Sequence, residues 1–168
     1  FDGTEIDRSQ RDWNTNKTIL TGDLSGNDNA NIAYTEATRS DNSYHVVTVY
    51  NKATEVVLDG LVVTGGNGPP GQTWTTKKTG AGLDTIISVL TVRNCTFEKN
   101  SGTMGTSITD NSAGSTLRIE NTIFQDNVSH MAGTMHVAGN YVIESCIFYN
   151  NHTKDSPFGY EWAGGLFL

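Results

Sequence analysis

An oxygen-rich segment near the N-terminus carries the first pattern that could do chemistry. Asp23, Ser25, Asn27 and Asn29 place oxygen-bearing side chains at alternate positions. Ca²⁺ prefers oxygen ligands, and the spacing resembles the start of a calcium loop, so these four are candidate Ca²⁺ ligands. The segment departs from such a loop at position 28, where Asp replaces the expected Gly, and at position 34, where Tyr replaces the bidentate Glu. A metal-free turn rich in Asp, Asn, Ser and Gly is the alternative, and Ca²⁺ is the only cofactor that the sequence suggests.

Aromatic side chains gather in two of three segments that interrupt the regular part of the chain. These three inserted loops are residues 22–42, 67–79 and 152–163. Trp74 lies in the second loop, and Phe158, Tyr160 and Trp162 lie in the third. Exposed aromatic side chains on loops often form contact sites for carbohydrate or protein. The four residues are therefore candidate ligand-binding residues, and the alternative is that the loops bury their own rings.

An internal repeat shows which elements must position these residues. Residues 90–100, 117–127 and 141–151 align without gaps, and each copy ends in Phe-x-x-Asn. Residues 57–66 form a looser copy. A second repeated element, a glycine-led strand, lies between the copies and aligns Gly82, Gly105, Gly133 and Gly165. Each unit is therefore predicted to contain this strand, a turn and an alternating strand.

The periodicity of the repeat predicts an all-β fold. Apolar residues alternate with a period of two, as at Leu117 and Ile119, which excludes helical repeats. Leucine-rich repeats need a Leu-x-x-Leu-x-Leu core that is absent, so the coils of a parallel β-helix, a solenoid, remain. We expect one domain over residues 1–168, with three short strands per rung and about five to six rungs. Strands are expected in residues 18–20, 44–50, 56–64, 83–97, 107–124, 135–148 and 166–168.

Stacked rungs place equivalent residues on top of each other, so side chains form ladders. One predicted ladder is an aromatic stack in the core, made of Phe97, Phe124 and Phe148. Two others are amide ladders, one made of Asn100, Asn127 and Asn151 and one made of Asn94 and Asn121. We interpret all of these residues as structural.

The Gly-Gly-x-(Ile/Leu) and Phe-x-x-Asn pair resembles the repeat of chlamydial polymorphic outer-membrane proteins. More broadly it resembles right-handed parallel β-helix (pectin-lyase-like) repeats of bacterial surface and secreted proteins, and the likeness covers nearly the whole chain. Met104 and Ala132 depart from the pattern, because they replace its first Gly. The resemblance implies a right-handed parallel β-helix; it says little about function, because this fold hosts lyases, hydrolases, adhesins and filaments.

Cleavage of a polysaccharide would need a pair or cluster of carboxylates stacked on one face. Asp84 aligns with Ser107, Met135 and Phe167, Asp110 is expected in a turn, and Asp126 aligns with Lys99 and Asn150. Only one column collects charges, namely Asp59, Arg93, Glu120 and Glu144. Alternating charge on an exposed ladder is an ordinary way to keep a sheet soluble. No catalytic residue is therefore predicted.

The two cysteines occupy one ladder column, with Thr122 between Cys95 and Cys146. Two rungs would separate their Cα atoms by roughly 9–10 Å. A disulfide needs Cα atoms within about 7 Å, so we predict two free thiols.

Composition and charge exclude several partners. The net charge is −7 and no basic block exceeds Lys77-Lys78, whereas a nucleic-acid groove needs clustered cations, so no nucleic-acid partner is expected. No run approaches the roughly 18 apolar residues of a membrane span, so none is predicted in this segment. Apolar residues make up only 36% and charged residues only 17%, and Thr, Asn, Gly and Ser fill the deficit, as a stacked rod with polar ladders would need.

Two functional hypotheses remain. The first is a non-catalytic β-helix segment of a longer extracellular or cell-surface (secreted) protein, acting as stalk, adhesin or filament subunit. Its partners would be other copies or flanking domains stacked end to end, and a glycan or a host or cell-surface protein as ligand. The alternative is a carbohydrate-binding or polysaccharide-cleaving module that uses the aromatic loops at one corner.

Overall fold

The computed structural model describes residues 2–50, 55–69, 79–86, 89–154 and 165–167. Its described part is all-β, with two short 3-10 helices, η1 (Arg8–Gln10) and η2 (Ala37–Arg39). Every strand pairing in it is parallel, which confirms the predicted all-β class with parallel strands. No helix in the described ranges has the length and apolar character needed to cross a bilayer.

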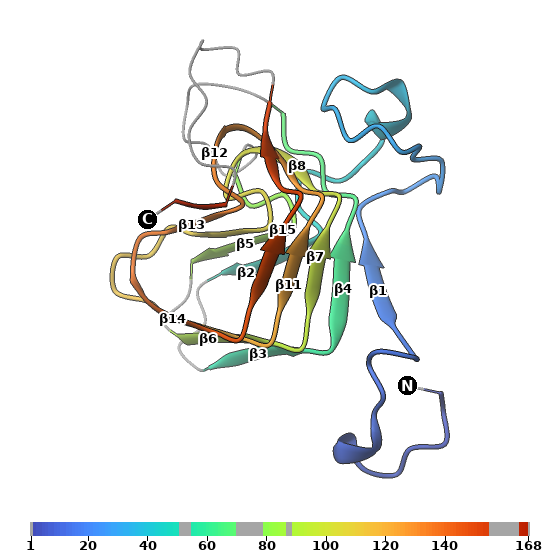
Figure 1. Cartoon of the computed structure of the whole chain (residues 1–168), viewed down its shortest axis with the longest axis vertical. Helices are drawn as coiled ribbons and strands as arrows, with labels where there is room; N and C mark the ends of the chain where they lie inside the picture. Colours follow the sequence, from blue (N-terminus) through green and yellow to red (C-terminus); the bar gives the residue numbers. More distant parts are fainter. Residues whose placement is uncertain (1, 51–54, 70–78, 87–88, 155–164, 168) are drawn as a thin grey trace.

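The strands form four sheets, named here A to D (Figure 1). In spatial order, sheet A contains β1 (Thr18–Thr21), β4 (Leu61–Thr64), β7 (Thr96–Glu98), β11 (Ile123–Gln125) and β15 (Ile147–Tyr149). Sheet B contains β17 (Leu166–Phe167), β13 (Met135–Val137), β9 (Ile108–Asp110), β5 (Leu83–Ile86) and β2 (Val47–Tyr50). Sheet C contains β14 (Asn140–Glu144), β10 (Thr116–Glu120), β6 (Val89–Arg93) and β3 (Val56–Asp59). Sheet D contains β16 (His152–Thr153), β12 (Val128–Ala132) and β8 (Ser101–Met104).

The chain visits the sheets in a fixed order. From β6 to β9 it contributes one strand each to sheets C, A, D and B, and β10 to β13 and β14 to β17 repeat that order. The prediction of three strands per circuit is therefore too low by one in this part of the chain. Sheet D was missed because β8 and β12 are rich in small, polar residues, which in sequence look like turns. The predicted loop 152–163 likewise begins with β16 rather than after it.

The predicted register of the repeat is confirmed. Leu117 pairs with Leu90 and Tyr141, and Phe124 pairs with Phe97 and Phe148. The three phenylalanine rings stack in the core, with centroids 5.4 Å and then 4.5 Å apart and planes within 13° and 11°. Offset stacking of this kind adds stability beyond the buried area alone, so the aromatic ladder ties three circuits together.

The predicted alignment of the glycine-led strand is wrong at its first and last copies, because Leu166 pairs with Met135 and Gly165 therefore corresponds to Thr134 rather than to Gly133. Leu83 pairs with Ile108 rather than with Thr106, and Ile108 pairs with Met135. The residue equivalent to Gly105 and Gly133 is Gly80, and their φ angles are +53°, +59° and +62° respectively. Glycine is needed at the turn into sheet B because this left-handed conformation penalises a Cβ atom.

The two amide ladders differ in environment. Asn100 and Asn127 are fully buried and Asn151 is half-buried, and these side chains run along the inside of the corner between sheets A and D. Asn94 and Asn121 lie at the opposite corner, between sheets C and A, in a left-handed conformation with φ of +53° and +46°. The inner ladder is therefore part of the core, whereas Asn121 of the outer ladder is exposed to solvent.

Candidate functional site

A cleft on the outer face of sheet A is a candidate site in the described ranges. Its volume is about 290 Å³. One wall is the N-terminal arm, residues 2–17, and the floor is made by sheet A and its corner with sheet C. The lining residues are Trp13, Asn14, Lys17, Gly60, Leu61, Val62, Asn94, Cys95, Thr96, Asn121, Ile123, Ser145 and Ile147.

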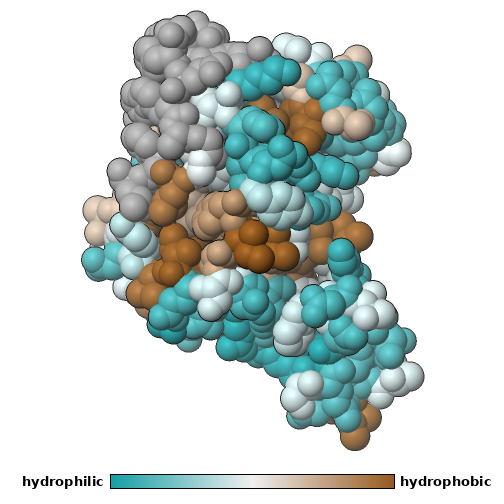
Figure 2. Space-filling view, viewed as in Figure 1, coloured by the Kyte–Doolittle hydropathy of each residue, from teal (hydrophilic) through white to brown (hydrophobic). Residues whose placement is uncertain are grey.

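The floor of the cleft is an apolar column. Val62, Thr96, Ile123 and Ile147 line it and pair in sequence across sheet A, with side chains opposite to the core-facing phenylalanines, and Ile19 continues the column beyond the cleft. Ile19 and Ile147 are 58% and 53% exposed, so part of this column is open to solvent. Figure 2 shows apolar atoms gathered in the middle of this face, between the hydrophilic arm and the hydrophilic insertion 22–42.

The arm is fixed to the sheet by ion pairs to Asp59, the last residue of β3. Its carboxylate, only 8% exposed, pairs with Arg8, with Arg11 Nη2 at 2.9 Å and with Arg93 Nε at 3.2 Å. Asn94 Nδ2 donates to Asp59 Oδ1 at 2.8 Å. Burial alone would raise the pKa of Asp59, but the hydrogen bonds from Arg8, Asn94 and Arg93 outweigh it and lower the pKa to about 2. Asp59 therefore stays charged and holds the arm at all ordinary pH values.

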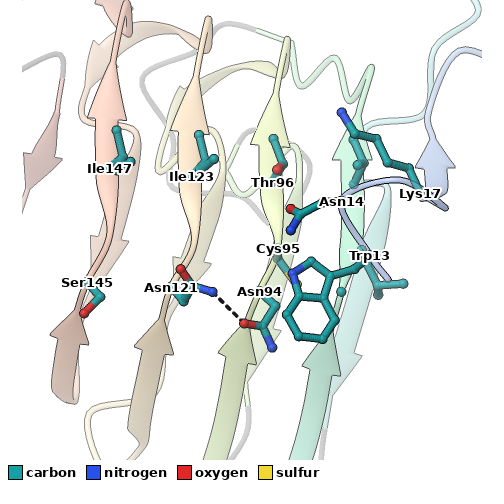
Figure 3. A pocket seen from close by; sticks show the side chains of 13 residues that line it. Trp13, Asn14, Lys17, Asn94, Cys95, Thr96, Asn121, Ile123, Ser145 and Ile147 are labelled. Atoms are coloured by element: carbon teal, nitrogen blue, oxygen red, sulfur yellow. Dashed lines mark hydrogen bonds between the residues drawn. The ribbon is translucent and has the colours of Figure 1, made fainter. Parts of the chain in front are cut away.

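These ion pairs position Trp13 over the corner of sheets C and A (Figure 3). Gly60 makes the approach possible, because it has φ of +72° and a Cβ atom there would lie 3.1 Å from Trp13 Cβ. Trp13 was not predicted as a site residue. Trp13 lies outside the repeated segments, so no repeat pattern marks it. Only the packing of the arm against Asp59 and Gly60 brings Trp13 next to the repeat.

Polar groups at the edge of the cleft come from one position of three successive circuits. Asn94, Asn121 and Ser145 share a left-handed backbone, with φ of +53°, +46° and +54°. Asn121 Nδ2 donates to Asn94 Oδ1 at 2.7 Å, as Figure 3 shows. Within the described ranges, Asn121 Oδ1, Ser145 Oγ, Lys17 Nζ and Trp13 Nε1 have no hydrogen-bond or ion-pair partner. The cleft thus presents both donors and acceptors to a ligand.

The candidate Ca²⁺ ligands lie together on the insertion between β1 and β2. The Asp23 carboxylate accepts hydrogen bonds from the backbone N–H groups of Asp28 at 3.0 Å, Asn27 at 3.2 Å and Gly26 at 2.8 Å, and these lower its pKa. Asn29 Oδ1 accepts from Asn31 N at 2.7 Å, whereas Ser25 contributes its N–H to Asp41 at 2.9 Å. No cluster of three or more His, Cys, Asp or Glu suited to a metal occurs in the described ranges. Ca²⁺ binding by Asp23, Ser25, Asn27 and Asn29 stays a prediction.

Arg39, which sequence reasoning missed, anchors this insertion. Its side chain is 1% exposed, pairs with Asp28 at 2.8 Å and donates to the carbonyl oxygens of Gly66 at 3.1 Å and Lys99 at 3.0 Å. Burial lowers the Arg39 pKa and the Asp28 charge opposes that effect. A buried cation is tolerated only when paired in this way, so Arg39 joins the insertion firmly to the corner of sheets A and D.

The predicted aromatic patch lies outside the described residues. Trp74, Phe158, Tyr160 and Trp162 all belong to it. The separate loops that carry them leave the described part after Pro69 and after Lys154. Their ligand-binding role stays a prediction.

The acidic residues do not assemble into a pair on the cleft. The predicted column of Asp84 is wrong at two positions, where Thr109 and His136 stand in place of Ser107 and Met135, and right at Phe167. Asp84 is buried and accepts a hydrogen bond from Tyr50, and burial raises its pKa. Asp110 ends β9 rather than lying in a turn, and it is buried against the hydroxyl of Ser115.

The charged column that contains Asp59, Arg93, Glu120 and Glu144 is confirmed. Arg118, two residues before Glu120 on the same strand, also pairs with Glu120 and, at 2.8 Å, with Glu144. The residues that line the cleft include no carboxylate. The described charges therefore form an ion-pair network on the surface of sheet C.

Both cysteines are free, and Thr122 lies between them in the column as predicted. Cys95 is 2% exposed and Cys146 is half-buried, and burial raises the pKa of both thiols. Their positions inside the corner of sheets C and A fit a packing role.

The chain matches no protein-family model, no curated protein and no solved structure. Its function is therefore inferred from its own residues.

Proposed function

We propose that the chain is a right-handed parallel β-helix segment of about five to six rungs, acting as a non-catalytic stalk, adhesin or filament subunit. The observation that carries the proposal is the fixed order in which the chain returns to sheets C, A, D and B, each time adding a parallel strand beside the previous one. Connections between parallel strands of one sheet are right-handed in about 98% of cases, which supports the handedness. Repetition of this kind builds a rod, and a rod suits a spacer or a scaffold.

The last circuit supports stacking with further protein. Ile143, Cys146 and Phe148 belong to core columns, yet they are only partly buried because no circuit covers them in the described ranges. In the part of the chain that the structure describes, the backbone of β14 also has no strand partner on the side away from β10. Asn140 N–H donates to Ser115 O, and Glu144 O accepts from Asn121 N, so the alternating residues Tyr141 and Ile143 direct their backbone groups away from β10. Such an edge is a template for another strand, so flanking domains or further copies are the proposed end-to-end partners.

An extracellular or cell-surface location is part of the same proposal. It is supported by the resemblance of the repeat to chlamydial polymorphic outer-membrane proteins and other bacterial surface proteins. A glycan or a host or cell-surface protein would be the ligand of an adhesin of this kind.

The edge can be tested with two variants at one position. Tyr141 is 41% exposed, and its N–H faces outward, so Tyr141→Pro blocks strand addition without removing a bond to β10. Tyr141→Thr keeps the N–H and serves as the matched control. We expect the wild type and Tyr141→Thr to form rods or oligomers that grow with concentration, seen by light scattering and electron microscopy, and Tyr141→Pro to stay monomeric. A wild-type chain that is monomeric at every concentration would contradict stacking between copies.

Non-catalytic function is tested separately. Incubation with plant, bacterial and host polysaccharides is expected to release no new reducing ends. Release that increases with protein concentration would instead support the polysaccharide-cleaving alternative.

A further inference from the structure

The cleft beside Trp13 combines three features that a stalk does not need. It has an aromatic ring held at its edge, an apolar floor at Ile123 and Ile147, and unpartnered polar groups on the corner residues. We propose that this cleft binds carbohydrate, with the apolar face of a pyranose ring against Trp13 and its hydroxyl groups bonded to Asn121 and Ser145. The inference rests on the proposed function and deepens it, because it assigns the glycan ligand of an adhesin to a site; the glycan-binding experiment and the stacking experiment can fail independently of each other.

The polar groups match hydroxyl groups better than other ligands. Asn121 Oδ1 is an acceptor, Trp13 Nε1 and Lys17 Nζ are donors, and Ser145 Oγ can do both, whereas sugar hydroxyls also donate and accept. A phosphate or nucleic-acid ligand would call for several cations, and Lys17 is the one cation that lines the cleft in the described structure. A peptide that extends the sheet would bind at an edge, whereas this cleft lies on a face.

The shape of the site supports a short contact rather than a deep pocket. The volume of about 290 Å³ is at the lower end of small-ligand sites, which fits one or two sugar units. Asn94, Asn121 and Ser145 recur at the corners that precede three neighbouring strands of sheet A, and such strands lie about 4.8 Å apart. A glycan chain laid along the rod would therefore meet one polar corner residue for each strand that it crosses.

The site is also preorganised. Trp13 lies two residues after Arg11. Arg11 donates to the carboxylate of Asp59 at 2.9 Å and to the backbone carbonyl oxygen of Asp59 at 3.2 Å. The corner residues are held by their left-handed backbone and, for Asn121, by the bond to Asn94. A ligand therefore has to order few side chains when it binds, and the smaller loss of conformational entropy favours affinity.

The test uses hexasaccharides of glucose, N-acetylglucosamine, mannose and galacturonate, with binding measured by calorimetry and by tryptophan emission. A Trp74→Phe/Trp162→Phe background leaves Trp13 as the single emitter. We expect at least one hexasaccharide to bind and to change the emission of Trp13. Trp13→Ala should weaken that binding at least tenfold, and Trp13→Phe only a few-fold, since a smaller ring remains.

Ser145→Gly separates ligand contact from anchoring of the arm, because it keeps the left-handed backbone and does not touch the arm. We expect it to weaken binding about three- to tenfold, as the loss of one hydrogen bond would. Asn150→Gly is the matched control, with φ of +51° against +54° for Ser145 and a place at the opposite end of β15, and it should bind as the wild type does.

Two outcomes would overturn the proposal. One is the absence of binding to every hexasaccharide. The other is binding that survives both Trp13→Ala and Ser145→Gly but is lost in the Trp74→Phe/Trp162→Phe background, which would assign the ligand to the aromatic loops.

Discussion

Replacing Asn127 with alanine should destabilise the fold by about 3–5 kcal/mol, far more than an ordinary loss of a polar side chain. Asn127 is fully buried at the centre of the inner ladder. Its Oδ1 accepts from both the N–H and the Nδ2 of Asn100 at 3.1 Å, and its Nδ2 donates to the carbonyl oxygens of Phe97 and Gln125 and to Asn151.

The magnitude follows from what alanine leaves behind. Asn100 N–H loses its acceptor in a site without access to water, which costs about 1–3 kcal/mol. The side-chain amide of Asn127 also donates two hydrogens. Losing the hydrogen bonds that they make lowers the free energy of unfolding by about 1 kcal/mol each. Asn100 Nδ2 keeps its bond to Val63 O at 3.1 Å, so it adds no orphaned group.

Urea denaturation followed by circular dichroism measures this loss as a shift of the midpoint at constant slope. Asn121→Gly is the control from the outer ladder, because it keeps the left-handed backbone and removes one exposed bond to Asn94. We expect it to cost less than about 1 kcal/mol. Equal costs for Asn127→Ala and Asn121→Gly would refute the distinction between a buried and an exposed ladder.

Three further predictions concern the arm, the thiols and the metal. The folded pKa of Asp59 lies below the ordinary value of 3.8, so its ion pairs are intact above 3.8 and are lost as the pH falls through about 2. Trp13 emission should therefore report release of the arm near pH 2, and Asp59→Asn should release it at neutral pH; a pH-independent spectrum contradicts this. Iodoacetamide should label half-buried Cys146 before Cys95, which is 2% exposed, and equal rates by mass spectrometry would refute this. Ca²⁺ should raise the melting temperature of the wild type but not of Asp23→Ala, whereas identical melting with Ca²⁺ and with EDTA would support the metal-free turn.

The register of the repeat could be predicted from the sequence because stacking pairs equivalent residues of successive repeats with each other. Phe97, Phe124 and Phe148 pair because each fills the same core position, and a shift of one residue would turn every ring to the solvent. Sheet D could not be predicted, since the buried strands β8 and β12 mix small, polar and apolar residues and lack an alternating apolar pattern. Burial there depends on the surrounding sheets and has no local signature.

The candidate site was harder to predict than the fold. Asn94 and Asn121 were found as a ladder, but their sequence does not say that they face solvent rather than the core. Trp13 joins them through the ion pair of Arg11 with Asp59, residues 48 positions apart. Contacts of this kind arise from the packing of a non-repeating arm, and a search for periodicity passes over them.

The inner amide ladder gives the stacked circuits a polarity. At each step the earlier circuit donates and the later one accepts, from Gly66 N to Asn100 Oδ1, from Asn100 to Asn127 and from Asn127 to Asn151. Gly66 ends the series on one side, because it has no side-chain oxygen to offer, and Asn151 is the last acceptor of the series in the described ranges. A circuit that continues this ladder would have to face Asn151 with a side-chain acceptor, so the ladder can be extended only in a head-to-tail sense and not by two identical faces. An assembly would then grow in one direction. A circuit would be added on the side of Asn151 only when that circuit brings its own acceptor.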